Sequence, residues 1–462
     1  MATSTGSSAM YDVVILGGGS GGYACALRSA QLGRRVALIE KAELGGTCLH
    51  RGCIPTKAML HSAEVADLAR AATSFGVQAQ LKGIDMPAVH RYKDGVVGRL
   101  HKGLQGLVAS AGIEMVSGHG RLTSANTVHV QGRDIQGNVI VLATGSRARL
   151  LAEIPIGGPV VTSDEAMTVG KVPDRVVILG GGVIGVEFAS IYRSFGAEVT
   201  VVEAAEHLIP NEDIALSQAL RRAYRKRGIA VMTGVSASST ETTNDEVSLT
   251  LSDGSVLSAD LLLVAIGRAP VTDDMGFEEV GVHLDRGFVR TDDRLRTTVE
   301  GVYAVGDIVP GLQLAHRGFA QGIFVAEHIA GGEPTPINES GIPRVTYSDP
   351  EVVSVGATEA EVRAEFGNAH VAELNLGGNG KSQILKTTGF VKVVSATAGG
   401  PVLGVHMIGA RMSEQAGEAQ LIVNWEALPA EVAALVHAHP TQNEAVGEAH
   451  MALAGAPLHS HS

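Results

Sequence analysis

The sequence has few cysteines, fewer basic than acidic residues and no long apolar run. Three cysteines among 462 residues fit a reducing cytoplasm. Apolar runs such as Leu261–Ile266 are far too short to span a bilayer. Net charge is −12, which argues against nucleic acid and anionic membranes as main partners.

The first residues of the sequence are not expected to form a signal or transit peptide. Residues 1–9 have no charge and no apolar stretch, so we expect a disordered leader over residues 1–10. The tail His459–Ser462 is expected to be frayed, and its histidines do not predict a metal site. The length suggests about three domains, and a hydrophobic content of 45% is ample for large cores.

A dinucleotide-binding fingerprint lies near the N-terminus. A strand, a glycine-rich turn, a helix, a second strand and an acid occupy Tyr11–Leu16, Gly17–Gly22, Tyr23–Leu32, Val36–Ile39 and Glu40. Gly17 allows a tight turn, Gly19 lets the backbone approach a pyrophosphate, and Gly22 packs helix on strand. The helix N-terminus would face the phosphates, and Glu40 a ribose hydroxyl.

The same pattern returns 163 residues later. The matched pairs are Gly17 and Gly180, Gly19 and Gly182, Gly22 and Gly185, Gly33 and Gly196, and Glu40 and Glu203. One offset at five positions indicates an internal repeat. The sequence therefore predicts two dinucleotide-binding domains.

Two of the cysteines, Cys48 and Cys53, lie within the glycine-rich segment Gly45–Lys57. In a regular helix five residues rise about 7.5 Å, beyond the usual Cα separation of a disulfide, so an oxidised pair needs a distorted turn. A strained, small-loop disulfide is the kind that cycles. The alternatives are buried thiols or half a zinc site, although zinc would need two more soft ligands and only Cys25 is left.

The position of the cysteines suggests the cofactors. Cys48 lies eight residues after Glu40, so the first fingerprint holds its nucleotide beside the thiols. A cofactor that exchanges two electrons with a disulfide is a flavin, and we assign FAD to the first fingerprint and NAD to the second. Glu203, followed by two alanines, would repel a 2′-phosphate, which favours NAD over NADP.

Later strand ends supply further candidates for cofactor binding. Asp307 ends a strand beside a helix that begins near Ala315, which suits a second cradle for FAD, although an ordinary strand-end turn would look the same. The FAD site is expected to include Gly120, Thr144 and Gly145 as well. Gly267 is assigned to the NAD site.

Beyond the linker Gly332–Pro343 the pattern changes to mixed strands and helices without a nucleotide motif, typical of an α+β domain. Near its end, His439 precedes a proline, and Glu444 is expected one turn into the next helix. Such a pair can form a base with its orienting acid. A surface helix cap is the alternative.

Together these features resemble the flavoprotein pyridine nucleotide-disulfide oxidoreductases, most closely the dihydrolipoamide dehydrogenases, from about Tyr11 to Leu453. The specific motifs are Gly46-Thr47-Cys48, Gly52-Cys53-Ile54-Pro55, Gly180–Glu187, Val305-Gly306-Asp307 and the segment His437–Glu444. The chain departs from the family at His50-Arg51, where Asn-Val is common, at Thr56 (Ser) and at Gln442-Asn443 (Leu-Ser). None removes a reacting group.

The resemblance implies an α/β fold with two Rossmann-like domains, for FAD and NAD, plus a C-terminal α+β dimerisation domain. The expected boundaries are a leader at 1–10, an FAD domain at 11–150, an NAD domain at 151–270, a central FAD segment at 271–340 and the dimerisation domain at 341–462.

The resemblance also implies roles for the cysteines and their neighbours. Cys48 would exchange with a dithiol substrate, and Cys53 would face the flavin as a thiolate. Lys57 would lie near the flavin and pair with Glu187, which from spacing alone reads as a solvated surface pair.

For the C-terminal motif and the second FAD segment the implied roles are these. His439 would take a proton from dihydrolipoamide, Glu444 would fix its tautomer, and Asp307 would hold the ribityl chain.

The implied enzyme oxidises dihydrolipoamide to lipoamide, passing electrons through the Cys48–Cys53 disulfide and FAD to NAD⁺. It would be a cytoplasmic homodimer with composite active sites. Its partners would be lipoyl-bearing domains and the acyltransferase core of a 2-oxo acid dehydrogenase complex, or the glycine cleavage lipoyl protein.

Four rivals are disfavoured. Mercuric reductase and the large thioredoxin reductases use a further C-terminal pair, and no cysteine follows Cys53. Glutathione reductase usually needs basic residues near Glu203. A non-catalytic flavoprotein scaffold would not need the intact cysteine and histidine motifs.

Overall fold

The computed structural model describes residues 10–459. The expected leader, except for residue 10, and the tail beyond His459 lie outside the described residues. The chain forms two compact units: unit 1 holds residues 10–58, 88–149 and 268–337, and unit 2 holds residues 59–87, 150–267 and 338–459. Among the residues described, no helix is both long and apolar enough to cross a membrane.

Unit 1 is built on a parallel sheet with the strand order β3-β2-β1-β6-β19. The strands are β1 (Tyr11–Leu16), β2 (Val36–Glu40), β3 (Glu114–Ser117), β6 (Arg133–Leu142) and β19 (Val302–Ala304). An antiparallel extension adds β5 (Thr127–Val130) and β4 (Gly120–Ser124) to the first half of β6. Strands β1 and β2 are almost fully buried, since helix α1 (Ser20–Gln31) packs on them and Gly120 of β4 lies against Leu16 and Ile39.

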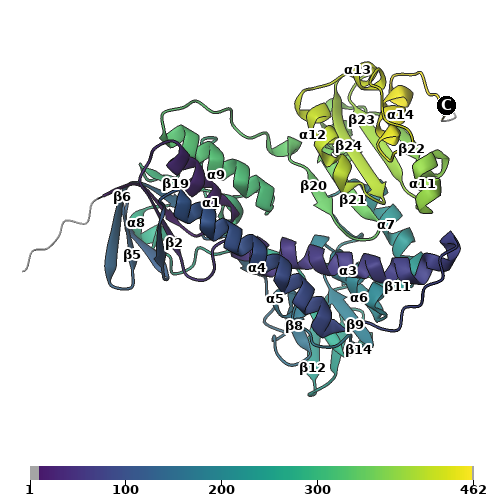
Figure 1. Cartoon of the computed structure of the whole chain (residues 1–462), viewed down its shortest axis with the longest axis horizontal. Coiled ribbons are helices and arrows are strands. Elements are labelled where there is room, and N and C mark those ends of the chain that lie inside the picture. The colour runs from purple at the N-terminus through teal and green to yellow at the C-terminus, as the bar shows by residue number, and fades with distance from the viewer. Residues whose placement is uncertain (1–9, 460–462) are drawn as a thin grey trace, which may run out of the picture. The chain divides into compact units, whose positions relative to one another are not determined.

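Helices α1 (Ser20–Gln31) and α9 (Ala315–Ile329) pack side by side in unit 1 (Figure 1). The two helices can approach closely because Gly322 has no side chain, and an added Cβ there would overlap the carbonyl oxygen of Gly21. Gly318 likewise lies against Ser20. Glycines on both helices thus bring the start of α9 beside the start of α1.

Unit 2 contains a second parallel sheet, in the order β11-β10-β9-β15-β8. Its strands are β8 (Val160–Thr162), β9 (Arg175–Leu179), β10 (Glu198–Glu203), β11 (Ile229–Thr233) and β15 (Leu261–Val264). Helices α6 (Val183–Phe195) and α7 (Ile214–Arg227) pack on it. A small antiparallel sheet joins β12 (Ala237–Thr242), β13 (Val247–Leu251) and β14 (Val256–Ala259).

The C-terminal part of unit 2 is an antiparallel sheet in the order β20-β21-β24-β23-β22. Its strands are β20 (Arg344–Thr346), β21 (Glu351–Gly356), β22 (His370–Asn375), β23 (Phe390–Ser395) and β24 (Val402–Gly409). Its helices are α10 (Glu359–Phe366), α11 (Gly380–Leu385), α12 (Ala416–Asn424), α13 (Pro429–Ala433) and α14 (Glu444–Leu453). Helix α14 begins at Glu444, so the expectation that this acid lies one turn inside the helix is wrong by one turn.

Two longer helices begin within or after the cysteine segment. Helix α3 (Cys53–Ala71) follows the short α2 (Gly46–Arg51), from which only Gly52 separates it. Helix α4 runs over Met86–Ser110.

Candidate functional site

The first glycine-rich turn has the backbone that its sequence predicts. Gly17 adopts φ +112°, and an added Cβ there would overlap the carbonyl oxygen of Ala143. A Cβ at Gly22 would overlap the carbonyl oxygen of Gly17, so this glycine presses α1 onto the turn itself. Nothing lies within 4 Å of the Cβ position of Gly19. The turn is therefore closed by Gly17 and Gly22 and open at Gly19, which suits a pyrophosphate at the helix N-terminus.

The second turn repeats this geometry. Gly180 also has φ +112°, a Cβ at Gly185 would overlap the carbonyl oxygen of Gly180, and the space beside Gly182 is open. Since the sequence repeat is reproduced in the backbone, both turns can hold the diphosphate of a dinucleotide.

The acid after each second strand is held in the same way. Glu40 accepts hydrogen bonds from the backbone N–H of Gly18 at 2.7 Å and of Ala42 at 2.8 Å. Glu203 accepts equivalent bonds from Gly181 at 2.6 Å and from the alanine at 205 at 2.7 Å. A fixed carboxylate with unused lone pairs at the strand end is the acceptor that a ribose 2′-hydroxyl requires.

At the end of β19, the expected FAD residue Asp307 belongs to a group of hydrogen-bonded polar side chains. The hydroxyl of Ser146 donates to Asp307 at 2.5 Å and accepts from the guanidinium of Arg268 at 2.7 Å. Thr144 donates its hydroxyl to the carbonyl of Val271. This side-chain set, which ends β6 and β19, fits the polar part of a dinucleotide.

The remaining candidates are backbone positions. Gly145 (φ +74°) and Gly267 (φ +105°) have open space at their Cβ positions, and Ala315 is the first residue of α9. Gly120 differs, because its Cβ would press on the apolar side chains of Leu16, Val128 and Ile39. Gly120 therefore fits the packing between β4 and the sheet.

The structure holds Cys48 and Cys53 as a dithiol, with no disulfide between them. A hydrogen bond to Cys53 raises the pKa of the Cys48 thiol, burial raises it further, and the ammonium of Lys57 opposes both. The two sulfurs and the lysine thus influence one another within unit 1. Among residues 10–459, the structure brings together no group of three or more His, Cys, Asp or Glu side chains that could hold a metal ion.

The cysteine segment lies directly on the first nucleotide turn. The N–H of Gly45 donates to the carbonyl of Gly18 at 2.8 Å, and a Cβ at Gly46 would come within 2.7 Å of the Cα of Gly19. Tyr23 of α1 is near enough that Cys48, after burial, contributes to raising its pKa to about 12. A nucleotide bound at this turn would therefore adjoin the redox pair.

His439 and Glu444 form a pair in unit 2. The His439 Nδ1 lies 2.7 Å from a Glu444 oxygen, and the other oxygen accepts from the N–H of Thr441 at 2.7 Å. Burial alone would raise the pKa of Glu444, but these two hydrogen bonds outweigh it and lower the pKa. Because Nδ1 is engaged and the side chain is 77% exposed, Nε2 is available to an incoming proton donor.

A second histidine–acid pair, which the sequence analysis did not single out, lies beside the first. His437 Nε2 is 3.0 Å from Glu418, whose other oxygen accepts from the amide of Asn443 at 2.5 Å. A Cβ at Gly447 would overlap the His437 ring, so the ring lies against α14. The His-x-His spacing was the available signal for this pair.

Glu187 is buried on α6, 2% exposed, and accepts the N–H of Tyr347 at 2.9 Å. Glu187 itself is thus not a solvated surface residue. Lys57 belongs to unit 1 and Glu187 to unit 2, so their pairing stays a prediction. The same division separates the cysteines from His439.

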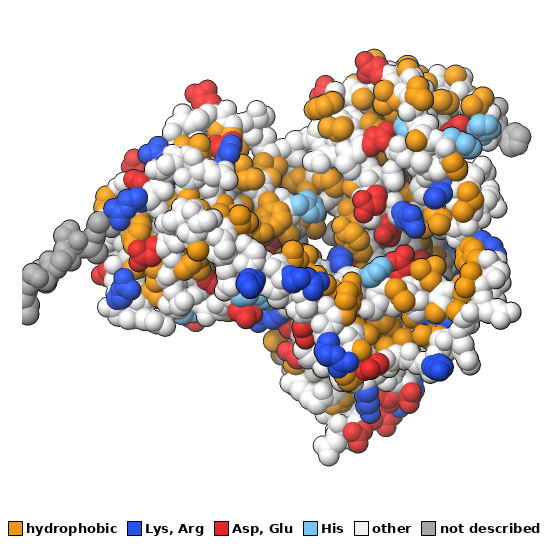
Figure 2. Space-filling view, in the orientation of Figure 1, with side chains coloured by type: hydrophobic (Ala, Val, Ile, Leu, Met, Phe, Trp, Pro, Cys, Tyr) orange, Lys and Arg blue, Asp and Glu red, His pale blue; other side chains and the backbone are white. Residues whose placement is uncertain are grey.

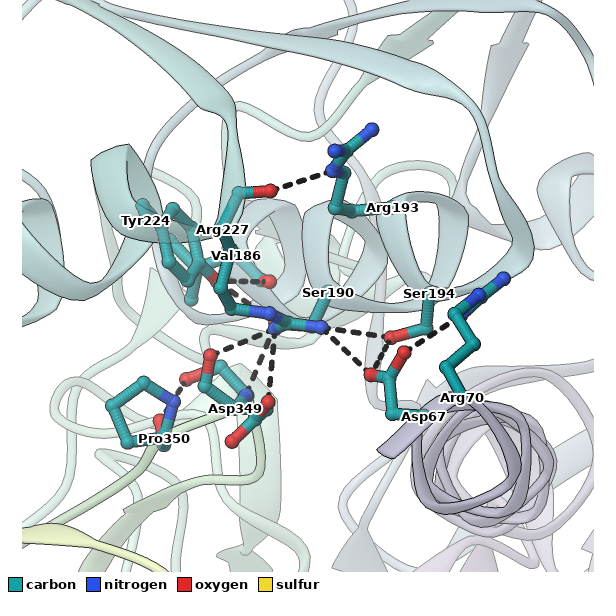
Figure 3. Close-up of polar contacts among 11 residues, drawn as sticks. Asp67, Arg70, Val186, Ser190, Arg193, Ser194, Tyr224, Arg227, Asp349 and Pro350 are labelled. Carbon is teal, nitrogen blue, oxygen red and sulfur yellow. Dashed lines mark hydrogen bonds and ion pairs between the residues drawn. The ribbon is translucent and has the colours of Figure 1, made fainter. Parts of the chain in front are cut away.

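The later turns of α3 are anchored to the second nucleotide-binding domain (Figure 3). Arg227, at the end of α7, donates to Asp67 of α3 at 3.0 Å, to Ser194 of α6 at 2.8 Å and to the carbonyl of Asp349 at 2.8 Å. Ser194 also donates to Asp67 at 2.5 Å. This network of charged and polar side chains therefore fixes the later turns of α3, whereas the reactive Cys53 is the first residue of the helix.

Comparison with known proteins agrees with this arrangement. The family model described as pyridine nucleotide-disulphide oxidoreductase matches residues 11–322, and the dimerisation domain of the same family matches residues 342–450. A dihydrolipoyl dehydrogenase of Bacillus subtilis is 39% identical over 97% of this chain and 99% of its own. A mitochondrial dihydrolipoyl dehydrogenase of Arabidopsis thaliana is 36% identical over 97% and 91%.

Solved structures show the same fold. LpdA from Mycobacterium tuberculosis superposes with a TM-score of 0.90 at 26% identity, covering 96% of this chain and 99% of that one. The flavoprotein disulfide reductase RclA from Escherichia coli gives 0.87 at 25% identity, covering 96% and 99%.

These findings confirm the expected fold class, the enzyme class and the use of FAD and NAD, and the relatives agree with the expected dihydrolipoamide-oxidising activity. The dimerisation-domain match supports the expected homodimer. The chain belongs to the pyridine nucleotide-disulphide oxidoreductase family.

Proposed function

We propose that the protein oxidises dihydrolipoyl groups carried by a multienzyme complex, with Cys48 and Cys53 as its redox pair. The observation that supports this best is the seating of the cysteine segment on the first nucleotide turn, through the Gly45–Gly18 hydrogen bond. That contact supports a role for the two thiols next to the nucleotide turn that we propose for FAD.

The reaction begins with the oxidised cysteine pair. His439 accepts the proton of one substrate thiol at Nε2, while Glu444 holds Nδ1 and stabilises the imidazolium. The substrate thiolate attacks the Cys48 sulfur, forming a mixed disulfide and releasing Cys53 as a thiolate. The second substrate thiol then attacks the first sulfur and passes its proton to the departing Cys48, which leaves as a thiol. Lipoamide leaves, and two electrons remain on the cysteine pair.

When bound, FAD supplies a two-electron acceptor for the cysteine pair and NAD⁺ supplies the final hydride acceptor. Gly17, Gly19, Gly22 and Glu40 would hold the adenosine diphosphate of FAD, with Asp307 near its ribityl chain. The equivalent positions in the second turn, with Glu203 on the ribose, would hold NAD. Lys57 opposes the rise in the pKa of Cys48 and so favours thiolate.

We propose further that the His439 of one subunit completes the cysteine site of its partner. In the C-terminal part of unit 2, which carries His439, large apolar side chains are exposed on the single chain, with Trp425 at 75% and Val436 at 98%. Figure 2 shows apolar side chains over the face that carries α12 and α13. A partner subunit would bury this surface, and an isologous contact would produce two composite sites.

The physiological partners would be lipoyl-bearing domains and the acyltransferase core of a 2-oxo acid dehydrogenase complex, or the glycine cleavage lipoyl protein. The relatives named dihydrolipoyl dehydrogenase support this substrate class. With only three cysteines in the chain, a cytoplasmic location is consistent with this role.

Anaerobic addition of NADH to the FAD-loaded enzyme tests the redox pair. A long-wavelength charge-transfer band should appear in the wild type and be lost in Cys53→Ser, together with lipoamide turnover. Cys25→Ser is the matched control, because Cys25 is buried and burial raises its pKa to about 12. A flavoprotein scaffold would show simple bleaching or no change, and turnover that persists in Cys53→Ser would refute the disulfide relay.

A further inference from the structure

Gln442 is a buried amide at a position where dihydrolipoamide dehydrogenases commonly carry leucine. Its side chain is 4% exposed. Oε1 accepts the hydroxyl of Ser382 at 2.6 Å, and Nε2 donates to the carbonyl of Ala410 at 3.0 Å. A buried amide is tolerated when both of its ends are hydrogen-bonded. Both ends of the Gln442 amide are therefore hydrogen-bonded, one to Ser382 on α11 and the other to Ala410 just after β24.

A second side chain, at the start of α11, is hydrogen-bonded to the residue that precedes Gln442. Asn379, the N-cap of α11, accepts the N–H of Ser382 at 2.9 Å and donates its amide to the carbonyl of Thr441 at 3.0 Å. Asn379, Ser382 and Gln442, which we call the polar bracket, thus hold two consecutive residues of the turn that follows His439.

The bracket leads to His439 through a short chain of hydrogen bonds. The carbonyl of Thr441 is held by the bracket, and its N–H donates to Glu444, whose other oxygen meets the His439 ring. The start of α11 also lies beside that ring, since a Cβ at Gly380 would be 4.0 Å from the His439 Cε1. A shift of α11 would therefore move both the ring's neighbour and the acid that orients it.

We propose that Asn379, Ser382 and Gln442 are positioning residues that set the orientation of the His439 imidazole for proton transfer. The inference rests on the proposed function, in which His439 takes the substrate proton. The bracket does not touch the reacting atoms. It replaces apolar packing at residue 442 with directed hydrogen bonds, and those bonds fix the turn in one register against α11.

The test compares Gln442→Leu, Ser382→Ala and the double variant in the FAD-loaded dimer. Ser382→Ala removes one buried hydrogen bond to Gln442 and should lower kcat/KM for dihydrolipoamide about 3- to 10-fold, and Gln442→Leu, which removes two, should lower it by at least as much. Each should also displace the acid limb of the pH profile. The double variant should lose less than the product of the two, because both partners are then apolar. Transfer from NADH to an artificial acceptor should not change.

Gln383→Leu is the control, since Gln383 lies on the same helix, is exposed and donates only to the carbonyl of Gly377. An unchanged pH profile and rate in Gln442→Leu and Ser382→Ala would overturn the inference. An equal loss in both half-reactions would also overturn it, because that pattern indicates a general structural effect. His439→Gln, measured in parallel, separates the two proposals: if it keeps dithiol turnover, the proposed function itself fails.

Discussion

Replacing the buried Lys392 of β23 should destabilise unit 2 far more than replacing an exposed cation. Its ammonium lies 2.8 and 3.0 Å from the two oxygens of Asp213 and 2.8 Å from Glu359. The side chains of Lys392 and Asp213 are only 4% and 1% exposed. Lys392→Met keeps the length but leaves the Asp213 carboxylate buried without its cation. Breaking a buried pair in this way costs about 3–5 kcal/mol.

The control is Arg121→Met, which removes an exposed ion pair with Glu279, where both side chains are more than two-fifths exposed. Such a pair contributes about 0–1 kcal/mol. At about 2–4 °C per kcal/mol for a cooperative unit of 150–250 residues, Lys392→Met should lower the melting temperature by roughly 6–20 °C and Arg121→Met by no more than about 4 °C. Scanning calorimetry of the FAD-loaded protein measures both.

The pH dependence gives a second measure of the same pair. Burial would raise the pKa of Asp213, but the hydrogen bond from Lys392 and further N–H donors outweigh it and lower the pKa. The contribution of this carboxylate is therefore present above its ordinary pKa and is lost as pH falls through the lowered one. The gap between wild type and Lys392→Met should narrow in that direction. Equal melting shifts for the two substitutions, or a gap that widens in acid, would refute the reasoning.

Three further predictions follow from other sites. Burial lowers the pKa of His406 and of His450 to about 4, so below pH 6.5 the unfolded chain binds protons that the folded protein does not. The urea midpoint of unfolding should therefore fall as the pH is lowered from 6.5 toward 4. His450→Leu should reduce that fall. Glu203→Ala should lower kcat/KM for NAD about 10- to 100-fold, as expected for losing charged hydrogen bonds, and comparable use of NADP by the wild type would contradict the assignment. An equimolar mixture of Cys48→Ser and His439→Gln subunits should recover roughly a quarter of wild-type activity after random exchange, because half of the dimers are then mixed and each mixed dimer has one intact site; no recovery after verified subunit exchange would exclude composite sites.

The backbone of the nucleotide sites could be predicted because glycine spacing constrains it directly. At Gly17 and Gly180 the positive φ and the close carbonyl neighbour leave no room for a side chain. The resulting turn is a local property, readable from a dozen residues. The roles of the individual site residues stay predictions.

Side-chain partners that come from distant segments could not be predicted in this way. Ser146 reaches Asp307 across 161 positions, and Asn379 reaches Thr441 across 62. Neither pairing leaves a periodic signal, because each depends on how the strands are ordered in the sheet. The cysteine spacing predicted a distorted turn, but the hydrogen bond that seats the loop on Gly18 required the folded chain.

Glu40 and Glu203 are held by equivalent hydrogen bonds, and this similarity limits where the protein can distinguish FAD from NAD. FAD and NAD share an adenosine diphosphate half, and the two turns present that half with the same φ, the same glycine contacts and the same pair of N–H donors to the acid. Two sites that bind the same half of each cofactor in the same way cannot distinguish the cofactors by that half. Discrimination between flavin and nicotinamide must therefore lie at the opposite end of each molecule, where the first site offers Asp307 and Ser146 and the second has only the open backbone near Gly267 among its expected residues.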